Sequence, residues 1–229
     1  MRIVLITILS ILVQLAAAQD TAYVSGLKTA LQQKWPANRT INLVFHGHSV
    51  PSGYFNTPNV KTLDAYPQLV LQALKQKYPY AVINVITTAI GGENSSSGAK
   101  RFKKDVLPHR PDVLFIDYAL NDRKLGLEQT EKNWRKMIRQ ALKKKIPVIL
   151  LTPSPDTSVE WTKAENELAQ LAAMITRLAR EYGIGLADSY GAFIEAANEG
   201  RNIKEYMSQS NHPNRKGHEL IAAAIIKYF

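Results

Sequence analysis

Short apolar runs alternate with segments of helical pattern along most of this chain. The runs expected to form buried strands cover residues 41–45, 81–87, 113–119, 147–151 and 184–187. The segments expected to form helices cover residues 63–78, 97–107, 128–145, 163–182 and 217–229. Alternation of this kind predicts a parallel sheet, because each crossover places a helix on a face of the sheet. We therefore expect an α/β fold, a three-layer α/β/α sandwich with a central parallel five-stranded sheet.

The first residues have the composition of a targeting segment. Met1 and Arg2 give a basic start, an apolar stretch follows over residues 3–15, and three alanines occupy residues 16–18. This pattern predicts a secretory signal peptide over residues 1–18, one domain over residues 19–229, and a periplasmic or secreted protein. The apolar stretch is shorter than the ~20 residues that span a bilayer, so we expect no stable membrane insertion.

The composition restricts both stabilisation and partners. The chain has no cysteine, so disulfides and thiolate metal sites are excluded. It carries 29 Lys+Arg against 19 Asp+Glu, and many of the cations lie on predicted helix faces. Such charge is typical of a solvated surface, and the alternative is attraction to acidic glycans or anionic membrane surfaces. No nucleic-acid-binding motif accompanies it, so we expect no nucleic-acid partner.

Four polar patches stand out against this pattern, at residues 47–49, 91–94, 121–122 and 212–214. The first three follow expected strands, and ligands of parallel sheets bind beyond the carboxyl ends of the strands. We therefore expect these patches to meet at one edge of the sheet.

Each patch holds a candidate catalytic residue, and three of these residues also have a simpler structural interpretation. Ser49, after a glycine turn, is a candidate nucleophile or a helix cap. Gly92 offers a backbone N–H to a ligand or forms an ordinary turn. Asn121 is a candidate oxyanion donor or a turn residue. His212, with an ordinary pKa near ~6.5, suits a general base. Together these groups are what acyl transfer from an ester requires.

With these four residue types in this order, the chain resembles the SGNH hydrolases, also called the GDSL esterase/lipase family. The matching blocks are Gly47-His48-Ser49, Gly92, Asn121-Asp122 and His212-Pro213-Asn214. The resemblance implies the SGNH, flavodoxin-like fold, with Ser49 as nucleophile and His212 as base. It also implies an oxyanion hole made by the Ser49 and Gly92 N–H groups and the Asn121 side chain, with no metal and no cofactor.

Three positions depart from the family pattern. His48 stands where the first block usually has aspartate, Ala119 where the third usually has glycine, and Gln209 where an aspartate usually precedes the histidine by three. A glutamine can accept the His212 Nδ1–H, but it cannot stabilise the imidazolium as a charge would. The sequence leaves open a Ser-His dyad with a backbone or Gln209 acceptor, an acid from elsewhere (Glu205 or Asp188), or lost activity.

The resemblance implies a secreted serine ester hydrolase, and we expect it to remove acetyl or other short acyl groups from a carbohydrate. Tyr54 and Phe55, in the loop beside Ser49, could stack on a sugar or simply pack in the core or rim. The alternatives are a lysophospholipase or thioesterase, which use the same groups, and a catalytically weak glycan-binding module. The expected partner is thus a small-molecule or glycan ester, and the sequence makes no prediction about the oligomeric state.

Overall fold

The central sheet of the protein is parallel and has five strands in the order β2-β1-β3-β4-β5. The structure, a computed structural model, describes residues 23–229, so the predicted signal peptide lies outside the described residues. The strands are β1 Thr40–Gly47, β2 Val82–Thr87, β3 Val113–Asp117, β4 Val148–Leu151 and β5 Gly185–Ala187. The expected sheet is confirmed, but β3 ends at Asp117 because residues 119–122 turn into a short helix, α6 Ala119–Asp122.

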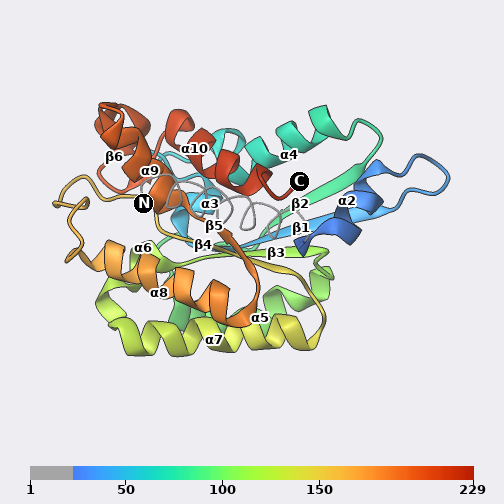
Figure 1. The fold of residues 1–229 in the computed structure, drawn as a ribbon, viewed down its shortest axis with the longest axis horizontal. Coiled ribbons are helices and arrows are strands. Elements are labelled where there is room, and N and C mark those ends of the chain that lie inside the picture. The colour runs from blue at the N-terminus through green and yellow to red at the C-terminus, as the bar shows by residue number, and fades with distance from the viewer. Residues whose placement is uncertain (1–22) are drawn as a thin grey trace, which may run out of the picture.

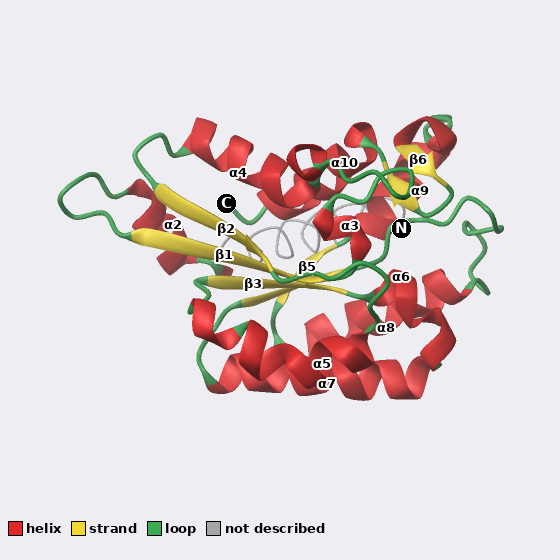
Figure 2. Ribbon diagram, turned by 180° about the vertical axis from the view of Figure 1, so that it is seen from behind, coloured by secondary structure: helices red, strands yellow, loops and turns green. Residues whose placement is uncertain are grey.

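Helices cover both faces of this sheet, which confirms the three-layer α/β/α sandwich (Figure 1). One face carries α4 Tyr66–Lys77, α9 Ser189–Asn198 and α10 Arg215–Ile226. The other carries α5 Ser95–Asp105, α7 Leu127–Lys143 and α8 Glu167–Tyr182, and Figure 2 shows the same layers from behind. No helix within residues 23–229 has both the length and the apolar character needed to cross a membrane.

Several short elements escaped the sequence patterns. These are the helices α2 Ser25–Gln32 and α3 Ser49–Ser52, the helix α9 named above, a small antiparallel pair formed by β6 Met207–Gln209 and β7 His212–Pro213, and 3₁₀ turns at Thr62–Asp64, Leu107–His109, Arg123–Leu125 and Ile203–Tyr206. Most are too short to show a helical or alternating period. Short elements nevertheless matter for the site, because α3 carries Ser49, α6 carries Asn121 and β7 carries His212.

Asparagine side chains set where three helices begin. Asn94 accepts hydrogen bonds from the Ser96 and Ser97 N–H groups at the start of α5. Asn214 does the same for Gly217 in α10, and Asn166 starts α8 at Glu167 rather than at the expected residue 163. Asn94 and Asn214 belong to two of the four polar patches, so these members of the patches have a structural task as N-caps.

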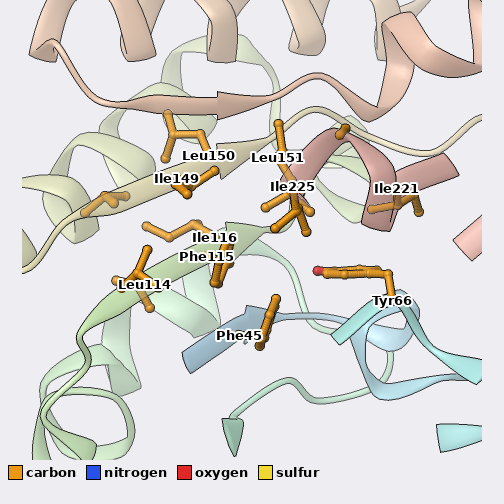
Figure 3. Packing of buried hydrophobic residues seen from close by; sticks show 14 of the residues in the cluster. Phe45, Tyr66, Leu114, Phe115, Ile116, Ile149, Leu150, Leu151, Ile221 and Ile225 are labelled. Atoms are coloured by element: carbon orange, nitrogen blue, oxygen red, sulfur yellow. The ribbon is translucent and has the colours of Figure 1, made fainter. Parts of the chain in front are cut away.

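The core holds the strand ends of the site in place. Phe45 of β1 stacks on Phe115 of β3 with ring centroids 4.3 Å apart, and Tyr66 of α4 meets Phe45 edge-on. Figure 3 shows these rings beside Ile221 and Ile225 of α10, which close the same layer. All five side chains are buried. Since β1 and β3 are packed in this way, their carboxyl ends are rigid supports for whatever follows them.

Candidate active site

The polar patches meet at the carboxyl edge of the sheet. Gly47, just before Ser49, pairs in register with Asp117 at the end of β3. The loop after β2 is tied to the same edge, since the Ile90 N–H donates to the Gly47 carbonyl at 3.1 Å. The Asn121 side chain donates to the Glu93 carbonyl at 2.8 Å. Gly92 therefore lies in a loop that is bonded on one side to β1 and on the other to α6.

Ser49 and His212 are in direct contact, 163 residues apart in the sequence. The Ser49 Oγ lies 2.9 Å from the His212 Nε2, and both residues are buried. The His212 Nδ1 lies 3.0 Å from the backbone carbonyl of Phe55, which can only accept a hydrogen bond. The hydrogen is thus on Nδ1, and Nε2 is free to accept the Ser49 hydroxyl. A hydroxyl that donates to an imidazole oriented in this way is the arrangement in which a serine can act as a nucleophile.

The group behind His212 is a backbone carbonyl rather than an acid. The Gln209 side chain accepts the Thr57 N–H at 3.0 Å and donates to the Asn211 side chain at 3.1 Å. Gln209 therefore does not contact His212 Nδ1 itself, because its amide is engaged with the loop that carries Phe55. Of the arrangements left open by the sequence, the geometry matches a dyad with a backbone acceptor.

Neither of the two acids considered from the sequence makes a hydrogen bond to His212. Asp188 caps α9 through the Gly191 N–H at 3.0 Å and accepts the Thr152 hydroxyl at 2.8 Å. Glu205 lies in a 3₁₀ turn, where its backbone carbonyl accepts from Asn214. Among residues 23–229 no carboxylate makes a hydrogen bond to His212.

Three N–H groups at this edge of the sheet are candidate donors to an oxyanion. Gly92 has a φ of +78°, a conformation that favours glycine, and space for a Cβ lies open around it. In the part of the chain that the structure describes, neither the Gly92 nor the Ser49 backbone N–H donates to another protein group. The Asn121 amide has two hydrogens and gives one to Glu93, so the other is available to a ligand.

The two aromatic side chains next to Ser49 occupy different places. The Tyr54 ring centroid lies 6.1 Å from that of His212. The ring packs so closely on Gly91 that a Cβ there would lie 2.7 Å from it. Tyr54 is thus a wall of the site. Phe55 contributes its carbonyl, while its ring lies under the Lys61 ammonium at 3.9 Å. A backbone carbonyl has no signature in the sequence, which is why this role of Phe55 was not foreseen.

Burial sets the direction of the His212 pKa. Desolvation lowers the pKa of His212 below its ordinary value, the Phe55 carbonyl partly opposes this, and any positive charge on His48 lowers the pKa further. The imidazole is therefore favoured in its neutral, proton-accepting form.

A partly buried polar network that the sequence did not reveal supports the Gly92 loop. Arg101 binds the Glu93 carboxylate with two nitrogens, at 2.9 Å and 2.6 Å, and also contacts the Tyr118 hydroxyl. That hydroxyl lies 3.2 Å from His46 Nε2, while His46 Nδ1 meets Thr88. Burial lowers the pKa of His46 to about 3, so this histidine is a neutral structural group.

Asp122 links the third patch to the second. Its buried carboxylate accepts the Ser95 N–H at 2.7 Å and the Trp134 indole N–H at 2.8 Å. These bonds join α6, which carries Asn121, to the first turn of α5 and to α7. Asp122 therefore fixes the position of its neighbour without facing the nucleophile. No group of three acidic or histidine side chains suited to a metal ion occurs in residues 23–229.

Comparisons with known proteins agree with this fold. The model of the GDSL-like lipase/acylhydrolase family matches residues 45–220. The chain is 22% identical to an acetylxylan esterase of Geobacillus stearothermophilus over 179 residues, 71% of this chain and 79% of that protein. A crystal structure of an acetylxylan esterase from the same organism superposes with a TM-score of 0.71 at 22% identity, over 82% of this chain and 93% of the other.

A two-domain esterase active on acetylated mannans gives a TM-score of 0.71 at 25% identity. The match covers 89% of this chain and 51% of that esterase, so this chain spans about half the length of that relative.

Proposed function

This chain belongs to the GDSL-like lipase/acylhydrolase family and is an ester hydrolase of the SGNH type, and from that premise we propose that Ser49 is its nucleophile and that it removes acetyl groups from a carbohydrate. The observation that carries the proposal is the 2.9 Å contact of Ser49 Oγ with a His212 whose tautomer is set by the Phe55 carbonyl.

The reaction follows from the groups at the site. Ser49 Oγ attacks the acyl carbon while His212 Nε2 takes its proton. The tetrahedral oxyanion receives hydrogen bonds from the Ser49 and Gly92 N–H groups and from Asn121. Its collapse breaks the ester bond, and His212 gives the proton to the leaving alcohol. Water then attacks the acyl-enzyme with His212 again as base, which releases the acid and restores Ser49.

The choice of a carbohydrate acetate rests on two supports. The relatives are named for acetylxylan and acetylated mannans. The Tyr54 ring also stands beside His212, where it could contact a sugar. A lysophospholipase or thioesterase and a weak glycan-binding module are the other outcomes that an experiment must separate.

The test is acetate release from O-acetylated xylo- and manno-oligosaccharides by the purified protein, with p-nitrophenyl acetate and octanoate in parallel. We expect acetate release and a preference for the acetyl ester. A preference for octanoate would indicate a lipid or thioester substrate. A folded protein that hydrolyses no ester and is not labelled at Ser49 by a fluorophosphonate would instead be a binding module.

The first residues lead us to propose export. We expect residues 1–18 to be removed and the mature chain to begin at Gln19, in the periplasm or outside the cell. The measurement is the N-terminal mass of the protein recovered from the periplasmic and extracellular fractions. An intact Met1 start on protein confined to the cytosol would overturn the proposal.

The pH dependence should follow the pKa of His212. Because burial lowers that pKa, the acid limb of kcat/KM is expected below pH 6.5, the ordinary value for histidine. The sign is fixed, since Nε2 must be unprotonated to accept from Ser49. The measurement is kcat/KM for p-nitrophenyl acetate between pH 4 and 9. An acid limb above the ordinary histidine value would contradict the environment described for His212.

Gln209 is expected to act through the loop that it holds. Gln209→Leu removes the acceptor of the Thr57 N–H, a bond worth ~1 kcal/mol, and should lower kcat about fivefold by loosening the Phe55 carbonyl. Gln209→Asp should raise the pKa of His212, because a nearby carboxylate favours the imidazolium, and should move the acid limb to higher pH by about one unit. Gln209→Glu keeps the reach of the side chain and an acceptor for the Thr57 N–H. It is therefore the matched control for the loss of that contact in Gln209→Leu. Unchanged kinetics in all three variants would show that residue 209 has no part in positioning His212.

A further inference from the structure

Ser49 lies against a second imidazole, that of His48. The His48 Nδ1 is 3.4 Å from Ser49 Oγ, and it accepts the Val50 N–H at 3.2 Å at the start of α3. Since Nδ1 accepts, it carries no hydrogen, and the hydrogen of a neutral ring is on Nε2. His48 is only 1% exposed. This imidazole is thus buried and fixed in one tautomer, and the mechanism above does not use it.

A buried carboxylate faces the other nitrogen of His48. Asp117 Oδ1 lies 3.4 Å from His48 Nε2, an ion-pair distance without a formed hydrogen bond, and Nε2 has no other polar partner among residues 23–229. Asp117 Oδ2 accepts the Tyr66 hydroxyl at 3.1 Å. The His48 Nε2–H is thus a buried donor without a formed hydrogen bond, and the Asp117 carboxylate at 3.4 Å is the acceptor near it, so a small movement that forms this bond would offset the cost of burying the donor.

The position of this carboxylate is set by the sheet. Asp117 ends β3 and is in register with Gly47 of β1, and Tyr66 is fully buried in the core. Burial and the nearby Asp117 raise the pKa of Tyr66, so its hydroxyl stays a donor. A series of side-chain contacts therefore runs from Tyr66 in the rigid core, through Asp117 and His48, to the nucleophile Ser49.

We propose that His48 and Asp117 together position Ser49, and we call this pair the positioning relay. Asp117 provides a fixed carboxylate on the side of the nucleophile, whereas residue 209, behind His212, does not provide one. The inference rests on the proposed function, in which Ser49 is the nucleophile. Asp117 holds the Nε2–H tautomer of His48. The Nδ1 lone pair then anchors the first turn of α3 through Val50 and limits the rotation of the Ser49 hydroxyl. His212 alone takes the proton.

The test uses two polar, uncharged substitutions. In His48→Asn the amide oxygen can replace Nδ1 as the cap of Val50, but the side chain is too short to reach Asp117. Asp117→Asn keeps an acceptor for Tyr66 and removes the charge. We expect each to lower kcat by between 10-fold and 10²-fold, on the order of the loss from a misplaced reacting group. The double variant should be no worse than either single one, because the two residues act as a unit. His109→Asn, on an exposed 3₁₀ turn, is the control.

The split between kcat and KM separates positioning from simple capping. We expect kcat to fall at nearly unchanged KM in both single variants, whereas a cap alone would leave Asp117→Asn at wild-type kcat, since that variant keeps the contact of His48 Nδ1 with the Val50 N–H. Wild-type kinetics in folded single variants, or additive losses in the double variant, would overturn the relay. Nitrogen-15 NMR of the five histidines of the wild-type protein gives a reading that needs no variant to fold. A His48 with its hydrogen on Nδ1 would overturn the proposal.

The two proposals fail in different ways. Ester hydrolysis and Ser49 labelling by the wild type, together with unaffected variants, would remove the relay and leave the esterase. A wild-type protein inert to both esters and fluorophosphonate would overturn the proposed function, and the relay with it.

Discussion

Replacing Ser49 by alanine is expected to lower kcat for ester hydrolysis by roughly 10⁴-fold to 10⁶-fold, the range seen when a serine nucleophile is removed. The physical reason is that no other hydroxyl shares its position 2.9 Å from His212 Nε2 among the described residues. Stability should change little, because the variant loses one hydrogen bond, worth ~1 kcal/mol, and a single buried oxygen. The measurements are kcat for p-nitrophenyl acetate, fluorophosphonate labelling, and Tm.

Ser52→Ala is the matched control. Ser52 belongs to the same four-residue helix, and its hydroxyl donates to the His48 carbonyl at 3.0 Å rather than to His212. It should keep kcat within about threefold, since it loses a single ordinary hydrogen bond. If Ser49→Ala retained wild-type turnover, hydrolysis would not pass through a Ser49 acyl-enzyme, whatever the geometry of the dyad.

The sequence predicted the parts of this fold that depend on repeated local patterns. Apolar runs such as residues 41–45 and 147–151 have no alternation, as expected of strands buried on both faces, and both are strands in the structure. The order of the polar patches along these strands then placed Ser49, Gly92 and Asn121 at one sheet edge, because parallel strands end there.

The rest of the site depends on contacts that no local pattern encodes. The acceptor of His212 is the Phe55 carbonyl, and its position depends on a loop bonded to Gln209, more than 150 residues later. His48 appeared in the sequence only as a departure from aspartate. It nevertheless keeps the capping task at Val50 and gains a second nitrogen that faces Asp117. Such substitutions are interpretable only when the partners brought by tertiary packing are known.

Asn121→Ala is expected to lower kcat by about 10²-fold to 10³-fold, the usual loss of one oxyanion donor. The amide gives one hydrogen to the Glu93 carbonyl and has a second for the developing negative charge. Because this second bond forms fully only in the transition state, kcat and kcat/KM should fall together, with KM nearly unchanged. Both constants are measured on the acetyl ester, with Tm as the check of folding.

The same substitution also removes the bond to Glu93, so a second variant must separate the two effects. Asn94→Ala removes the cap of α5 in the same loop, which should cost ~1 kcal/mol of stability and leave kcat close to wild type. If loosening of this loop were the whole effect of Asn121→Ala, both variants would lower Tm and raise KM to similar extents. A loss of less than threefold in kcat for Asn121→Ala would remove Asn121 from the oxyanion hole and leave the Ser49 and Gly92 N–H groups as its only donors. A large loss in kcat confined to Asn121→Ala, at unchanged KM, is the result that only a transition-state donor produces, since a structural bond would act on the bound substrate as well.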